Sequence, residues 1–140
     1  MIILDTNVVS ELMRPQPSAL VLTWVGNQPV RELCTTSISE AEVFYGIRLL
    51  PRGKRREALL SEAEGVFSED LGGRVLSFDR DAARAFSEIV AHRRSLGRPI
   101  NFADAQIAAI ARVSGAKVAT RDAGDFEDCG IEVVNPWAAA

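Results

Sequence analysis

Four acidic side chains occupy comparable points of this sequence and could together do metal chemistry. Asp5 directly follows the first apolar run of the chain, and Asp122 comes just past a later one. Glu42 and Asp104 fall in the first turns of two predicted helices. If the runs are parallel strands of one sheet, all four carboxylates reach the same edge, where open α/β sheets place their ligands.

Each acid also has an ordinary structural explanation. Ser39 stands three residues before Glu42 and Asn101 three before Asp104, which is the spacing of a helix-capping box. Acids near helix N-termini are stabilised by the helix dipole in any case, by about 0.3–1 kcal/mol. The other two acids could be turn residues. Taken singly, each acid is better explained as a cap or turn residue than as a ligand.

Two local details favour a metal. Gly46 lies one turn beyond Glu42 and leaves space beside that carboxylate. Asp104 belongs to a helix that is apolar on nearly every face, whose first basic residue is Arg112. A carboxylate in such surroundings is costly unless a cation compensates it, and oxygen ligands of this kind suit Mg²⁺ or Mn²⁺ better than zinc. Such metals most often act on phosphate esters.

Other chemistries lack their residues. His92 is the sole histidine and is expected on an exposed helix face, which excludes a two-histidine ribonuclease. The chain has no G-x-S-x-G elbow, no P-loop and no dinucleotide fingerprint. A receiver-like phosphoacceptor would need paired acids at the first strand and a lysine after the last, and both are absent. Cys34 and Cys129 lie far apart and are expected to be small buried hydrophobes, not a disulfide or a zinc site.

The elements that must position the acids follow from the apolar pattern. Short apolar runs indicate strands, and apolar residues at helical spacing indicate amphipathic helices between them. The alternation predicts an α/β fold with a central, mostly parallel sheet of four to five strands and helices on both faces. Thr6 or Asn7 is expected to cap the first helix. The expected strands cover residues 2–4, 32–36, 74–78, 117–120 and 132–134, and the main later helices cover 18–27, 39–50, 54–70 and 102–113.

Length and composition indicate one ordinary globular domain. The chain has 140 residues, of which 47% are hydrophobic and 25% charged, with a net charge of −3. No apolar run is long enough to span a bilayer and no signal-peptide pattern opens the chain, so a cytoplasmic protein is expected. With four acids assigned to a metal, the remainder carries −3 + 4 = +1. Two basic clusters could contact phosphate, although each alone is better explained as a solvated helix face: Arg52, Lys54, Arg55 and Arg56, then Arg93, Arg94 and Arg98.

Several motifs that occur in order along the whole chain closely resemble those of PIN-domain ribonucleases. The resemblance is strongest to the VapC-type toxins of toxin–antitoxin pairs, and particularly to their FitB-like branch. The motifs are Leu4-Asp5-Thr6-Asn7, Ala41-Glu42-Val43 with Tyr45-Gly46-Ile47, Asp104-Ala105-Gln106-Ile107-Ala108-Ala109, Ala119-Thr120-Arg121-Asp122 with Asp125-Phe126, and Asn135-Pro136-Trp137.

The resemblance implies a single PIN domain over residues 1–140, with a PIN-like three-layer α/β/α fold. It implies a Mg²⁺- or Mn²⁺-dependent endoribonuclease whose metal is held by Asp5, Glu42, Asp104 and Asp122. The fourth acid is the least constant in the family, and Asp125 could share or replace the role of Asp122. Thr6, Asn7 and Thr120 either hold waters and ligand carboxylates or serve as caps.

The resemblance also implies partners. These are an RNA substrate, a second copy of the chain, and an antitoxin of the ribbon–helix–helix or a similar DNA-binding type that covers the active site and binds operator DNA. A membrane is not among them. The alternative is a non-catalytic PIN-like module whose acidic pocket docks a basic partner.

Overall fold

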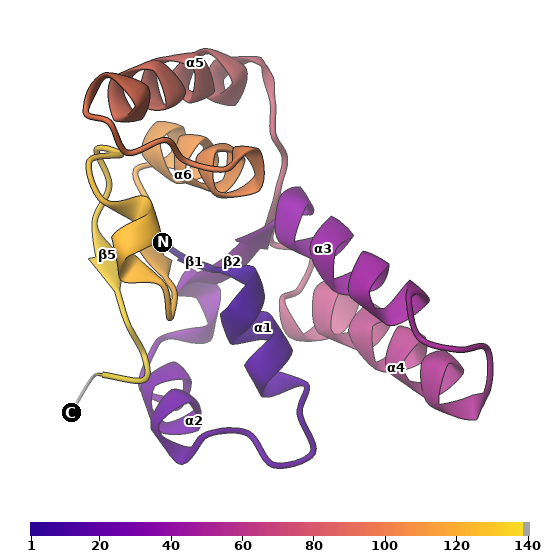
Figure 1. Ribbon diagram of the computed structural model, residues 1–140. Helices are drawn as coiled ribbons and strands as arrows, with labels where there is room; N and C mark the ends of the chain where they lie inside the picture. The colour runs from indigo at the N-terminus through magenta and orange to yellow at the C-terminus, as the bar shows by residue number, and fades with distance from the viewer. Residues whose placement is uncertain (139–140) are drawn as a thin grey trace.

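One five-stranded parallel sheet forms the centre of the protein in the computed structural model, which describes residues 1–138 (Figure 1). The strands lie in the order β3-β2-β1-β4-β5 and every neighbouring pair is parallel. From β1 the chain adds β2 and β3 on one side and then β4 and β5 on the other, so the order reverses between β1 and β4. The strands are β1 (Ile2–Leu4), β2 (Leu33–Thr36), β3 (Val75–Leu76), β4 (Lys117–Ala119) and β5 (Val133–Val134).

Helices cover both faces of the sheet, which confirms the expected three-layer α/β/α architecture (Figure 1). The long pair α5 and α6 packs on one face, and the N-terminal helices with α4 pack on the other. The helices are α1 (Thr6–Leu12), α2 (Ala19–Gly26), α3 (Ser37–Arg48), α4 (Lys54–Gly65), α5 (Arg80–Ser95) and α6 (Phe102–Ser114), with short 3-10 turns η1 (Val30–Glu32) and η3 (Ala123–Phe126).

The alternation of side chains along β1 separates two hydrophobic cores. Ile3 points to the α5–α6 side and packs with Ile107 and Val118. Ile2 and Leu4 point the other way, into the core that includes residues of α1, α3 and α4. Because β1 is buried on both faces, Asp5 is fixed where this strand ends.

The helix starts differ from the expectation at two acids. Asp5 itself caps α1, since its Oδ1 accepts the Thr6 amide at 2.8 Å, so the expectation that Thr6 or Asn7 is the cap is wrong. The hydroxyl of Thr36, not that of Ser39, caps α3. Glu42 therefore lies in the second turn of α3, and capping does not explain it. Of the two acids expected in the first turns of helices, only Asp104 lies there, because Asn101 caps α6.

Two other helices depart from the expected pattern. The helix predicted over residues 54–70 is α-helical only to Gly65 and ends in a wider π turn, η2 (Val66–Asp70). Helix α6 is buried along Ala105–Ala111 except at Gln106, but Phe102 and Val113 at its ends are exposed. In residues 1–138, no helix is both long and apolar enough for a bilayer crossing.

Candidate active site

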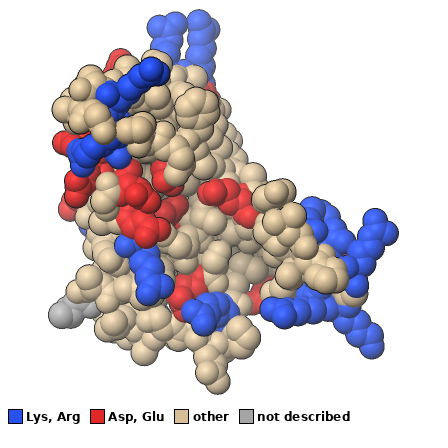
Figure 2. All heavy atoms as spheres, viewed as in Figure 1, with Lys and Arg blue, Asp and Glu red and all other residues tan. Residues whose placement is uncertain are grey.

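An acidic cavity of about 550 Å³ opens where the parallel strands end, next to the reversal between β1 and β4. Figure 2 shows acidic atoms gathered in the middle of one face, while basic atoms gather at the outer end of the α3–α4 pair. All four acids predicted from the sequence, and the reserve Asp125, line this cavity. Its walls are Asp5, Thr6, Asn7, Ser10, Glu11, Arg14, Glu42, Asn101, Asp104, Asp122 and Asp125.

Asp5 is the most constrained acid of the cavity and only 5% exposed. Besides capping α1, it accepts a hydrogen bond from the Thr120 hydroxyl to Oδ2 at 2.7 Å. Burial raises its pKa, the bonds from Thr120 and Thr6 lower it, and the nearby carboxylates of Glu42 and Asp122 raise it further. The two hydrogen bonds fix both oxygens of this carboxylate in place.

Glu42 reaches the cavity from the side of α3. Its Oε1 accepts a hydrogen bond from the Thr6 hydroxyl at 2.7 Å, and the Thr6 Oγ1 also lies 2.9 Å from the hydroxyl of the buried Ser39. No heavy atom lies within 4 Å of the position that a Cβ would take at Gly46, which agrees with the expected space one turn beyond Glu42.

Asp104 enters from the first turn of α6, where its Oδ2 accepts from the side-chain amide of Asn101 at 2.7 Å. Burial, followed by the charge of Asp5, raises its pKa to about 6, although the bond from Asn101 opposes the shift. Asp125 and Glu42 raise it further. The contributions of Asp5, Asp125 and Glu42 are those of neighbouring negative charges, which disfavour ionisation of Asp104.

Asn7 and Thr120 hold Asp122 at the rim of the cavity. The Asn7 amide donates to Asp122 Oδ2 at 3.1 Å, and the Asp122 backbone amide donates to the Thr120 hydroxyl at 3.1 Å. Thr6, Asn7 and Thr120 thus each hold one of the predicted ligand carboxylates, which was one of the two expected roles. Asp125 follows on η3.

No ion pair compensates these acids. Among the ion pairs of residues 1–138, none includes Asp5, Glu42, Asp104, Asp122 or Asp125. The cavity does contain Arg14, but its guanidinium pairs with the buried Glu11 at 3.3 Å. Four to five carboxylates therefore face one space with hydroxyl and amide partners alone.

A divalent cation fits the donor chemistry of the cavity, which offers carboxylate oxygens and no sulfur or imidazole. As the side chains lie, however, no three acids, histidines or cysteines within the described part of the chain converge closely enough to hold an ion. Glu42 and Asp104 are instead bonded to Thr6 and Asn101. Side-chain rotation of these two acids is needed to close a coordination sphere.

Comparison with known proteins agrees with this geometry. The PIN domain family profile matches residues 2–131. The chain belongs to the PIN-domain family. It is 42% identical to the VapC ribonuclease Y4jK of Sinorhizobium fredii over all of both chains, and 45% identical to the plasmid stability protein StbB of Pseudomonas syringae pv. tomato over 99% of this chain and all of that one. The solved structure of FitAB bound to an IR36 DNA fragment matches with a TM-score of 0.93 and 36% identity, over 100% of this chain and 98% of that chain.

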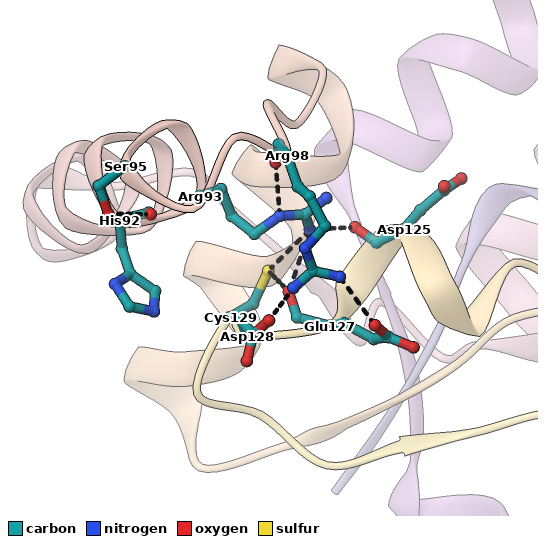
Figure 3. A network of polar contacts seen from close by, with 8 residues as sticks. All are labelled: His92, Arg93, Ser95, Arg98, Asp125, Glu127, Asp128 and Cys129. Atoms are coloured by element: carbon teal, nitrogen blue, oxygen red, sulfur yellow. Dashed lines mark hydrogen bonds and ion pairs between the residues drawn. The ribbon is translucent and has the colours of Figure 1, made fainter.

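One basic residue of this PIN domain lies where the sequence reasoning did not expect it. Arg93 was grouped with Arg94 and Arg98 as a solvated helix face, but it is only 5% exposed, so that interpretation is wrong for Arg93. Its guanidinium lies under the loop that follows η3 (Figure 3). The helical spacing of the buried Ala82, Ala85 and Ile89 continues at Arg93 and could have identified it. Arg94, Arg98 and His92 are exposed as expected.

Both cysteines are buried and free, which confirms that they form no disulfide. Burial raises the pKa of the Cys34 thiol to about 11 and also raises that of Cys129. Neither thiol is poised as a nucleophile.

Proposed function

We propose that residues 1–140 form a single PIN domain that acts as a Mg²⁺- or Mn²⁺-dependent endoribonuclease, the toxin of a toxin–antitoxin pair. The observation that carries the proposal is the cavity at the sheet edge, where five carboxylates meet without an ion-pair partner. The name of the Sinorhizobium relative, a VapC ribonuclease, supports the choice of RNA as substrate.

The residues that would hold the metal are Asp5, Glu42, Asp104 and Asp122, with Asp125 as the reserve for the fourth acid. A bound divalent cation would supply charge neutralisation, polarisation of a phosphate oxygen and an activated water. Asp5 supplies the fixed reference point, because both of its oxygens are held by hydrogen bonds. Glu42 and Asp104 supply the adjustable ligands.

The side chains around the acids then orient the phosphodiester. Glu42 or Asp104 takes the proton of the attacking water onto a carboxylate oxygen as the water oxygen bonds to phosphorus. The bond from phosphorus to one ribose oxygen breaks in the same step, and the leaving oxygen takes up a proton from solvent. Arg14, which lines the cavity, and Arg55, which lines the neighbouring groove, are the cations best placed to meet the RNA backbone. They offset the repulsion between the acids and the phosphates.

Partners follow from the same proposal. The similarity to FitAB on DNA supports an antitoxin of the ribbon–helix–helix or a related type and a joint complex on operator DNA. We also expect a homodimer and a cytoplasmic location, where RNA and operator DNA are found. The alternative function is a non-catalytic module, which the uncompensated acids also favour, since they could bind an arginine of a partner.

The deciding experiment incubates the purified chain with RNA and Mn²⁺, with and without EDTA, next to the Asp5→Asn variant. We expect cleavage that EDTA stops and that the variant lacks, while the circular dichroism spectrum is unchanged. Asn can keep the bond from the Thr6 amide through its oxygen and donate from its side-chain NH2 to the Thr120 hydroxyl, so the fold should survive. If the variant cleaves RNA as fast as the wild type, Asp5 has no role in metal binding. If the wild type binds RNA without metal and does not cleave it, the docking module is favoured.

A further inference from the structure

Arg93 donates hydrogen bonds to three backbone carbonyls, one on the loop after α5 and two on the segment 125–129 (Figure 3). Its Nη1 donates to the carbonyls of Asp125 at 2.9 Å and Glu127 at 3.0 Å. Its Nε donates to the carbonyl of Arg98 at 2.8 Å, and the Cys129 sulfur lies 3.8 Å from Nη1. A single guanidinium thus joins the end of α5 to the segment 125–129.

The segment 122–130 has few other backbone anchors. Its recorded backbone bonds are short-range, from Asp125 to the Asp122 carbonyl and from Glu127 to that of Gly124. Phe126 is buried beside the sheet, and the exposed side chain of Arg98 pairs with Glu127 and Asp128. For residues 125–129, Arg93 is therefore the buried side chain from outside the segment that holds the backbone by hydrogen bonds.

The two acids of the segment depend on these hydrogen bonds to different degrees. Asp122 is held directly by Asn7 and Thr120. Asp125 is held through hydrogen bonds of its backbone, and its carbonyl is one of those that accept from Arg93. Asp125 nevertheless lines the cavity, and its negative charge contributes to the raised pKa of Asp104.

We propose that Arg93 is a positioning residue that holds Asp125 at the acidic cavity, and that Asp125 thereby contributes to metal binding. The inference rests on the proposed function, because it assigns a part of the same site. Met at position 93 would remove every donor while preserving most of the side-chain volume, so three carbonyls would lose their partner and the segment would shift.

The test uses the full chain, four single variants, and the double variant that combines Arg93→Met with Asp125→Asn. Arg93→Met removes the hydrogen bonds of the guanidinium, and Arg93→Lys keeps the charge but replaces the planar fork by a single ammonium. Arg94→Met is the matched control, since Arg94 is the exposed neighbour on the same helix. Asp125→Asn removes the charge that Arg93 is proposed to position.

The first measurement is independent of metal. Cys129 contacts Arg93, whereas Cys34 is buried on β2, so the two free thiols report on different regions. Modification by a thiol reagent, followed by mass spectrometry, gives the rate at each thiol. Arg93→Met should accelerate the reaction at Cys129 at least about tenfold more than at Cys34, because Cys34 senses only the general loss of stability. Arg94→Met should match the wild type at both. An equal acceleration at both thiols in Arg93→Met would mean general unfolding and would overturn local positioning.

The second measurement is Mn²⁺ affinity by calorimetry, in a double-variant cycle. Arg93→Met and Asp125→Asn should each weaken binding by about tenfold, as loss of outer support does at metal sites. The double variant should be no weaker than either single one, since both remove the same contribution. Arg93→Lys should lie between Arg93→Met and the wild type.

The outcomes separate the two proposals. If the wild type binds no Mn²⁺, the proposed function fails and this inference fails with it. If the wild type binds Mn²⁺ but Arg93→Met binds it equally well, or if the two losses add, the positioning role alone is overturned.

Discussion

Two neighbouring regions of this PIN domain contain charged side chains that have no ion-pair partner among the described residues, and the two regions stabilise that charge in different ways. At the sheet edge, six carboxylates line one cavity, and all but Glu11 lack an ion-pair partner within residues 1–138. The second region surrounds the buried guanidinium of Arg93. This group also has no ion-pair partner within residues 1–138, but backbone carbonyls accept its hydrogen bonds.

The difference separates a scaffold from a site. The charge of Arg93 is satisfied by the fold, so its burial costs little beyond its desolvation, and removing it would orphan the carbonyls. The acids are held by hydroxyls and amides that fix their positions but do not cancel their mutual repulsion. Burial first, and then the charge of Asp5, raise the pKa of Asp104. Such a cluster gains stability only from a ligand that it does not itself contain.

The largest expected effect comes from the acid cluster. Asp104→Asn should lower metal-dependent RNA cleavage by at least about 100-fold, because it removes a proposed metal ligand. The Asn101 side chain caps α6 by accepting the backbone amide of residue 104, so the substitution leaves this cap in place. A cleavage assay at saturating Mn²⁺ measures it. Glu40→Ser changes an acid in the first turn of α3 that does not line the cavity, so this variant is the control and should cleave normally. Cleavage within threefold of the wild type would place Asp104 outside the site.

For Arg93, the main expected effect is on the stability of the fold. Arg93→Met should lower the free energy of unfolding by about 3 kcal/mol, because more than one buried carbonyl loses its donor at roughly 1–3 kcal/mol each. Urea unfolding of the metal-free protein gives the value. The exposed Arg94→Met should change it by less than about 0.5 kcal/mol. Equal free energies of unfolding for Arg93→Met and Arg94→Met would show that the hydrogen bonds of Arg93 do not stabilise the fold.

The pH dependence follows from Asp104. Its pKa in the folded chain is about 6, above the ordinary 3.8, so the folded state binds the proton more tightly between these values. The resulting stability is fully present below pH 3.8 and is lost as the pH rises through about 6. In the metal-free protein, the melting temperature of wild type relative to Asp104→Asn should fall across this range.

Metal binding should depend on pH in the opposite direction, since the metal needs the ionised carboxylate. Mn²⁺ affinity should be about tenfold lower at pH 5 than at pH 7 and should level off above pH 6. Calorimetry at several pH values measures this. A flat profile would contradict the participation of Asp104.

The smallest effect is expected at the surface. The side chain of Arg98 pairs with Glu127 and Asp128, but all three are well exposed. Arg98→Met should therefore cost no more than about 1 kcal/mol of stability, as exposed ion pairs do, and less in high salt. A loss as large as that of Arg93→Met would mean that the outer tie, not the buried one, holds the loop.

Much of the site could be read from the order of residue types. An acid after a strand buried on both faces, as at Asp5, must lie at the carboxyl edge of a parallel sheet, and Asp122 lies there for the same reason. Asp104 reaches this edge because α6 leads into β4, so that the N-terminus of α6 lies at the carboxyl end of the sheet. The expected boundaries of the strands were within two residues of those observed. The start of α3 was misplaced because Thr36 and Ser39 are equally good caps by type, and only the end of β2 selects Thr36.

The sequence by itself determined the fold class, the single sheet edge and the acids that reach it, because periodicity and strand ends act locally. Only the tertiary structure decided which hydroxyl holds which acid, as when Thr120 bonds Asp5 across 115 positions. It also decided that Arg93 lies inside and Arg94 outside. Those outcomes depend on contacts between segments far apart in the chain, and residue type alone carries no record of them.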